Sequence, residues 1–179
     1  MAAKKTGAKK PTKAKAPKTT KTTKSTKKTE EANIPLEKLQ EAVKEIKERL
    51  GINGKRRANV VIQGLPGVGK STIMAHLAHD TELNTVFSDG VLWTSLGENP
   101  DILSKLQLWA SALSLEETKN ATVEALTSQI SARLQEKRML LLVDDVWQVE
   151  HSKAFRVGSG EASIVFSSRL NDVAAALTS

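Results

Sequence analysis

The stretch Asn59-Val-Val-Ile-Gln-Gly-Leu-Pro-Gly-Val-Gly-Lys-Ser-Thr72 decides how this chain of 179 residues folds. Residues 60–62 form a short β-branched run, which predicts a buried strand. The residues from Gly64 to Ser71 then match the pattern G-x-x-x-x-G-K-[ST], in which backbone N–H groups surround phosphate oxygens. A helix predicted to run on to about His79 would place its positive end beneath the phosphates. The stretch therefore predicts a phosphate-binding loop between a strand and a helix.

Each polar residue of this loop has an expected role. Lys70 would bring its charge to the β- and γ-phosphates, and the Ser71 hydroxyl would join the ligand shell of Mg²⁺. A turn rich in Gly and Pro that binds no ligand is the alternative, but such a turn has no need of the Lys-Ser pair. The residues predicted to contact the nucleotide are Gly64, Leu65, Pro66, Gly67, Val68, Gly69, Lys70, Ser71 and Thr72.

The overall composition is typical of one intracellular domain with its own core. The chain has no cysteine, which excludes disulfides and thiolate metal sites. No apolar run approaches the roughly 18 residues of a membrane span, and the N-terminus lacks the apolar segment of a secretory signal. We therefore expect a cytoplasmic protein with no membrane partner.

The charge is divided unevenly along the chain. Residues 1–29 contain eleven lysines and no acid, whereas the remainder has sixteen bases against twenty acids, a net charge of −4. The first 29 residues are predicted to form a disordered basic tail, because they have too few apolar side chains to offset the entropy of ordering. One interpretation is binding to nucleic acid or another polyanion, with a nuclear or nucleoid location; the other is a solubilising spacer.

Residues 30–51 are predicted to form an amphipathic helix and a linker. An apolar stripe at spacings of three and four runs along this segment through Leu36, Leu39, Val43, Ile46 and Leu50. The stripe either packs on the domain that follows or pairs with a helix of a partner. Residues 52–179 are then expected to form the nucleotide-binding domain.

Strand patterns alternate with helical ones over the rest of the chain. Strands are predicted at 91–96, 139–143 and 163–168, and helices at 99–113 and 122–136, the first of these capped by Asn99. Residues 81–84 are predicted to be a loop. Because such alternation gives parallel strands with helices on both faces, the expected fold is a three-layered α/β/α domain of the P-loop NTPase type.

Two acids and one arginine complete the expected site. Asp144 follows a continuous apolar run and would hold Mg²⁺ opposite Ser71. Asp145 is a candidate to orient or deprotonate the attacking water, although adjacent strand residues normally point to opposite faces and leave it without a role. Arg169 follows a strand expected beside the P-loop strand, where it would meet the γ-phosphate; a surface arginine is the alternative. The predicted catalytic residues are Lys70, Asp145 and Arg169.

Four motifs in this order resemble the NB-ARC domain of the STAND class of P-loop ATPases, found in plant disease-resistance proteins, apoptosome scaffolds and bacterial relatives. They lie at 64–72, 87–93, 140–147 and 164–169, and the resemblance covers about residues 52–177. The resemblance implies ATP or ADP as the nucleotide, Mg²⁺, slow hydrolysis, and a switch between a closed ADP form and a self-associated ATP form. It also implies that Lys70 and Ser71 bind phosphate and Mg²⁺, that Asp144 serves the metal, and that Arg169 senses the γ-phosphate.

The sequence departs from the family pattern in its extent. The family continues with a fifth strand, a helical domain with a Gly-x-Pro motif and a winged helix with Met-His-Asp, and this chain stops at Ser179 before them. We therefore expect a partial module, with its P-loop strand at a sheet edge. The expected function is adenine-nucleotide binding in a switch ATPase, with slow or absent hydrolysis. The alternative is a nucleic-acid-binding protein that acts through its lysine-rich tail and retains a vestigial NTPase domain.

Overall fold

The computed structural model describes residues 35–52, 59–116, 120–158 and 160–178. The predicted tail at 1–29, together with residues 30–34 and 53–58, lies outside these ranges. Within them, none of the helices combines the length and the apolar character that crossing a membrane requires. The elements in chain order are α1 (Leu36–Arg49), β1 (Val60–Gln63), α2 (Lys70–His79), α3 (Thr81–Val86), β2 (Gly90–Gly97), α4 (Ile102–Ala112), α5 (Val123–Leu134), β3 (Met139–Val146), α6 (Val149–Lys153), β4 (Ser163–Ser168) and α7 (Asn171–Thr178).

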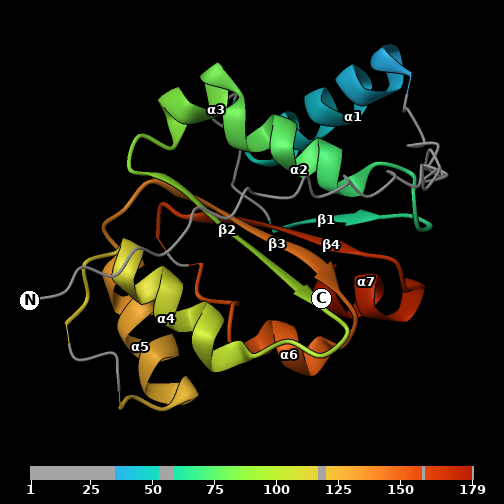
Figure 1. The fold of residues 1–179 in the computed structure, drawn as a ribbon. Helices are drawn as coiled ribbons and strands as arrows, with labels where there is room; N and C mark the ends of the chain where they lie inside the picture. Colours follow the sequence, from blue (N-terminus) through green and yellow to red (C-terminus); the bar gives the residue numbers. More distant parts are fainter. Residues whose placement is uncertain (1–34, 53–58, 117–119, 159, 179) are drawn as a thin grey trace, which may run out of the picture.

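The described strands form one parallel sheet in the order β1-β4-β3-β2. Helices α1, α2 and α3 cover one face of this sheet, and α4, α5, α6 and α7 lie on the other (Figure 1). This arrangement confirms the predicted three-layered α/β/α fold. It also confirms that the strand preceding Arg169 lies beside the P-loop strand, because β4 pairs with β1. Since all pairs are parallel, the carboxyl ends of β1, β3 and β4 meet at one edge of the sheet.

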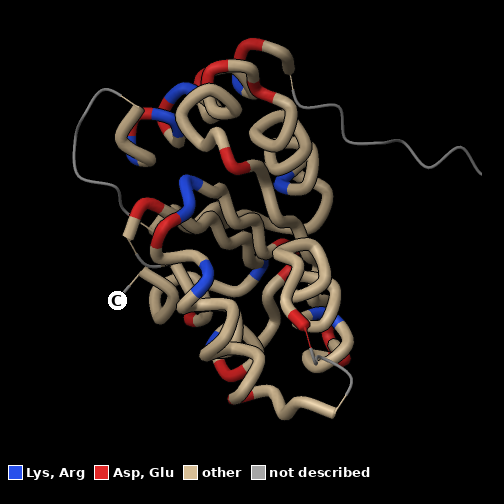
Figure 2. Tube along the Cα trace, turned by 90° about the vertical axis from the view of Figure 1, so that its left-hand side faces the viewer, with Lys and Arg blue, Asp and Glu red and all other residues tan. Residues whose placement is uncertain are grey.

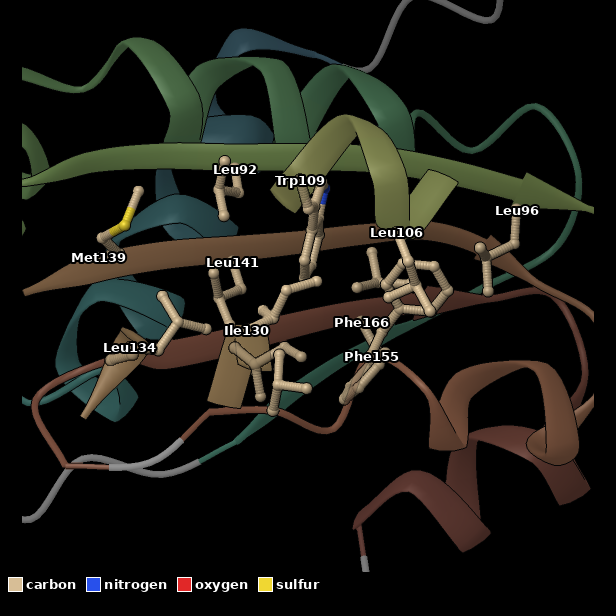
Figure 3. Packing of buried hydrophobic residues seen from close by; sticks show 14 of the residues in the cluster. Leu92, Leu96, Leu106, Trp109, Ile130, Leu134, Met139, Leu141, Phe155 and Phe166 are labelled. Atoms are coloured by element: carbon tan, nitrogen blue, oxygen red, sulfur yellow. The ribbon is translucent and has the colours of Figure 1, made fainter. Parts of the chain in front are cut away.

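The continuous apolar run of β3 is explained by two cores. Leu140 and Leu142 belong to the core beneath α2, whereas Leu141 and Val143 belong to the core beneath α4 and α5, because successive strand residues face opposite sides. Each of these four side chains is fully buried, which contributes about 1.5–3 kcal/mol per residue relative to exposure. Figure 3 shows the second core, where labelled residues of α4, α5, β3 and β4 pack together: Leu106, Trp109, Ile130, Leu134, Met139, Leu141 and Phe166.

The apolar stripe of α1 packs on the domain beyond its first residue, in line with the first of the two predicted alternatives, whereas Leu36 is 65% exposed. Leu39, Ile46 and Leu50 are buried in the core that also contains Met74 of α2. An ion pair adds to this packing, because Lys47 Nζ lies 2.8 Å from a carboxylate oxygen of Asp80. Apolar contacts and an ion pair therefore hold helix α1 against α2, the helix that follows the P-loop.

Two local predictions were wrong at helix starts. Residues 81–84 belong to α3, because the Asp80 side chain caps that helix by accepting hydrogen bonds from the backbone N–H groups of Glu82 and Leu83. Helix α4 is capped by Asp101 and not by Asn99: an Asp101 oxygen accepts from the backbone N–H of Ser104 at 3.1 Å. Several capping residues compete near each start, and sequence alone does not choose among them.

Candidate functional site

The loop between β1 and α2 has the backbone geometry that its glycines permit. Gly67 and Gly69 have φ values of 79° and 89°, in the left-handed region that side chains other than glycine rarely adopt. Gly69 is also the N-cap of α2, so the loop leads directly into the positive end of that helix. The backbone N–H of Gly64 donates to Ser168 O at 3.3 Å, which ties the start of the loop to β4.

Lys70 is the first residue of α2 and is 7% exposed. Its Nζ donates to the carbonyl oxygens of Gly64 (2.6 Å) and Leu65 (2.9 Å), within the loop itself. Burial lowers the pKa of Lys70 below the usual lysine value, the charge of Arg169 lowers it further, and Asp145 and Asp144 oppose the shift. An anion beside Nζ would therefore compensate a cation that the fold holds in a partly desolvated position.

Asp144 is held by a residue that the sequence analysis did not single out. Its side chain is 5% exposed, and its Oδ1 accepts hydrogen bonds from the Ser167 hydroxyl of β4 and from the Asp145 backbone N–H. The Asp145 N–H also donates to Ser167 Oγ at 2.9 Å. The sequence feature that could have indicated Ser167 is the pair of serines, 167 and 168, which follows three apolar residues and directly precedes Arg169. Ser167 orients the carboxylate that was predicted to serve the metal.

Asp145 faces the same cavity as Asp144, so the expected strand alternation does not hold here. The register between β3 and β4 shifts between Val143 and Val146, and Asp145 has a φ of 55°. A bulge of this kind turns one side chain out of the regular pleat, and aspartate tolerates the left-handed region better than most residues. The irregularity thus removes the geometric objection to a role for Asp145.

Arg169 has partners from the neighbouring strand, which argues against an unattached surface arginine. Its Nε donates to Asp145 Oδ1 at 2.8 Å. Its guanidinium carbon lies over the Trp147 ring, 5.2 Å from the centroid. Trp147 therefore contacts a site residue. Trp109 is 2% exposed and meets Phe155 edge to face in the core.

These groups surround one cavity of about 780 Å³, which is within the usual range for small-molecule sites. Three predicted loop residues are absent from its lining: Gly64, Leu65 and Val68, of which Leu65 is 73% exposed. Residues of α1 contribute to the wall, which the sequence analysis did not predict. The lining residues are Pro35, Leu36, Leu39, Pro66, Gly67, Gly69, Lys70, Ser71, Thr72, His76, Asp144, Asp145 and Arg169.

The cavity therefore combines a helix N-terminus and two cations with two carboxylates. Lys70, Arg169 and the amino end of α2 are suited to the phosphates of a nucleotide. The Ser71 hydroxyl and the Asp144 carboxylate both line this cavity and both offer oxygen ligands, which is the donor chemistry that Mg²⁺ prefers. The residues present thus fit a nucleotide phosphate chain with a bound Mg²⁺.

A family model and several known proteins match this chain. The NB-ARC domain family model matches residues 39–179, beginning within α1. The "Probable disease resistance protein At5g04720" of Arabidopsis thaliana is 30% identical over 110 residues, which are 60% of this chain and 12% of that protein. The "Probable disease resistance protein At5g63020" of the same plant is 27% identical over 135 residues, which are 72% of this chain and 14% of that protein. This chain therefore spans a small part of these relatives.

A solved structure shares the fold. The Aeropyrum pernix ORC1 protein, determined in complex with DNA, superposes with a TM-score of 0.52 and 15% sequence identity. The match covers 79% of this chain and 41% of the ORC1 chain. At this identity the likeness concerns the fold alone.

Proposed function

Because the chain belongs to the NB-ARC family and is a nucleotide-binding module of the P-loop ATPase type, we propose that it binds ATP and ADP with Mg²⁺ as part of a molecular switch. The observation that carries the proposal is the single cavity in which Lys70, Ser71, Asp144 and Arg169 meet. Adenine is proposed on the family relationship, and the sequence contains no Asn-Lys-x-Asp string of the kind that selects guanine.

We assign the phosphate contacts as follows. The N–H groups at the start of α2 and the Lys70 ammonium bind the β- and γ-phosphates. Ser71 and Asp144 hold Mg²⁺, which supplies charge neutralisation on the phosphates when bound. Arg169 binds the γ-phosphate, so the site distinguishes ATP from ADP. Ser167 keeps the Asp144 carboxylate oriented through its hydroxyl hydrogen bond.

Hydrolysis would use Asp145. Its carboxylate would orient the attacking water or accept its proton, while Lys70 and Arg169 stabilise the charge on the transferring phosphoryl group. We propose slow turnover, as suits a switch that must remain in its ATP form long enough to act. Self-association in the ATP form is part of the same proposal. It is proposed for a protein of the relatives' full length, of which the matched residues are 12% and 14%.

Calorimetric titration of MgADP and MgATP into the full chain tests the proposal. Lys70→Ala should abolish binding of both nucleotides, whereas Lys153→Ala, which removes an exposed lysine on α6, should leave both affinities unchanged. Asp145→Asn should keep binding and lose turnover. If folded wild-type protein binds neither nucleotide, the chain is not a nucleotide switch.

The second candidate function is polyanion binding through the basic tail at 1–29, favoured by its eleven lysines and absence of acids. In Figure 2 the basic and acidic segments of the described chain are interspersed, so the concentrated positive charge lies in the tail sequence. If the tail contacts six to ten phosphates, raising the salt from 50 to 200 mM should lower the affinity for DNA about 10³–10⁵-fold. Deleting residues 1–29 should abolish DNA retention and preserve nucleotide binding. If the intact chain does not bind DNA at 50 mM salt, this candidate fails.

A further inference from the structure

Three side chains at the carboxyl ends of two adjacent strands lie together beside the proposed nucleotide cavity. Asp145 lies in the bulge of β3, Trp147 follows β3 directly, and Arg169 follows β4. We call these residues the arginine cluster. Asp145 and Arg169 both line the cavity, whereas Trp147 supports the guanidinium from beside it.

The guanidinium of Arg169 is held in two ways. The Nε–H donates to Asp145 Oδ1 at 2.8 Å, an ion pair whose carboxylate is only 22% exposed. The guanidinium carbon lies 5.2 Å from the centroid of the Trp147 ring, within the range of a cation–π contact. The indole Nε1 of Trp147 is buried and has no hydrogen-bond partner in the described part of the chain, so no hydrogen bond of the indole fixes the ring.

The ion pair occupies one oxygen, Oδ1, of the carboxylate that hydrolysis would need. Asp145 cannot direct a water with the oxygen that accepts from Arg169 while this contact persists. Arg169 likewise cannot offer the same N–H group to a phosphate. The ion pair thus occupies one oxygen of Asp145 and one N–H group of Arg169, and it competes with the proposed role of each residue.

We propose that Trp147 is a positioning residue that holds Arg169 against Asp145, and that the terminal phosphate of a nucleoside triphosphate separates this pair and frees Asp145. This inference rests on the proposed function and deepens it. A phosphate that carries more negative charge than a carboxylate, and accepts bidentate hydrogen bonds, competes effectively for a guanidinium. A diphosphate has no group at this position and leaves the pair in place. The site would thus release its carboxylate only when a triphosphate is bound.

Asp145 competes with the γ-phosphate for Arg169. A substitution that weakens the ion pair should therefore increase the preference for triphosphate over diphosphate. Trp147→Leu should therefore raise the affinity for a non-hydrolysable ATP analogue relative to ADP by about two- to fivefold, the size of a partly exposed cation–π contact. Trp147→Phe keeps an aromatic face, so its affinity for the analogue relative to ADP should stay close to that of the wild type. Asp145→Asn should raise the ratio as well, and asparagine tolerates the left-handed backbone at this position.

Trp147 also provides an optical signal. Displacement of the guanidinium from its ring should change tryptophan fluorescence when the ATP analogue binds, and not when ADP binds. The change should be absent in Trp147→Phe and in Arg169→Met. Trp93→Leu removes a tryptophan that is 41% exposed on β2 and outside the cavity lining, so this control should keep both the ratio and the signal.

The experiment measures MgADP and Mg-analogue affinities and fluorescence titrations on the full chain, with thermal melts to verify folding of each variant. An analogue-specific signal and a raised ratio in Trp147→Leu support the inference. If the wild type binds both nucleotides but shows no analogue-specific signal, and Trp147→Leu leaves the ratio unchanged, the inference is wrong and the proposed function stands. If the folded wild type binds neither nucleotide, the proposed function fails, and the inference fails with it.

Discussion

Replacing Asp80 by alanine would remove a helix cap and an ion pair at once. The Asp80 side chain caps α3 through the N–H groups of Glu82 and Leu83, and it pairs with Lys47 of α1 at 2.8 Å. Loss of the cap costs about 1 kcal/mol. The pair is 18% and 20% exposed, so solvent screening reduces its contribution to about 0.5–1 kcal/mol. Asp80→Ala should therefore destabilise the domain by about 1.5–2 kcal/mol.

The contribution of Asp80 to the stability of the domain should also depend on pH. Burial raises the pKa of Asp80, but the hydrogen bond from Lys47 and the backbone hydrogen bonds outweigh it, so the net pKa lies below 3.8. A lowered folded pKa means that the native state binds fewer protons than the unfolded chain. The contribution to stability is therefore complete above about pH 3.8 and is lost as the pH falls through the folded value. Asp80→Asn, which can still cap, should differ from wild type at pH 7 and approach it below pH 3.8.

Urea unfolding of the full chain measures both effects. A loss of about 1.5–2 kcal/mol should lower the midpoint by roughly 1 M, given typical denaturant slopes. Asp80→Asn should lose only the ion-pair part, and a double-mutant cycle with Lys47→Met should recover that part as a coupling energy. Glu45→Gln disrupts an exposed ion pair on α1 and serves as the matched control, with a change below about 0.5 kcal/mol. Equal destabilisation by Asp80→Asn with and without Lys47 would refute the reasoning.

Three further substitutions test the loop, the site and the turn after α6. Gly69→Ala would place a Cβ at a φ of 89°, which should cost about 1–2 kcal/mol and weaken nucleotide binding in calorimetry. Ser167→Ala should weaken Mg²⁺-dependent binding more than Mg²⁺-free binding, because the buried carboxylate beside it loses a donor; equal losses would contradict this role. Gly160→Ala would bring its Cβ to 2.4 Å from the backbone oxygen of Gln135 and should lower the melting temperature, whereas Gly158→Ala, with its nearest contact at 3.7 Å, should melt much closer to wild type.

The arrangement of the sheet could be predicted from local patterns because parallel α/β folds obey strong rules. Alternating strand and helix patterns left few topologies open, and β4 lies beside β1 as expected. Helix α3 was wrongly predicted to be a loop, and the start of α4 was placed at Asn99 instead of Asp101, since several residues near each start can cap a helix. Assignments at 1–29 remain predictions, because they lie outside the described residues.

The sequence by itself determined the phosphate-binding loop, the buried strands and the presence of two acids and an arginine at strand ends. These features are local, because periodicity and residue type at adjacent positions encode them. Only the tertiary structure decided how the side chains meet. The bulge that turns Asp145 toward the cavity depends on strand register. The hydrogen bond from Ser167 to Asp144 and the contacts of Arg169 with Asp145 and Trp147 join residues more than twenty positions apart. The order and register of neighbouring strands create these contacts, and neither is written in any single stretch of sequence.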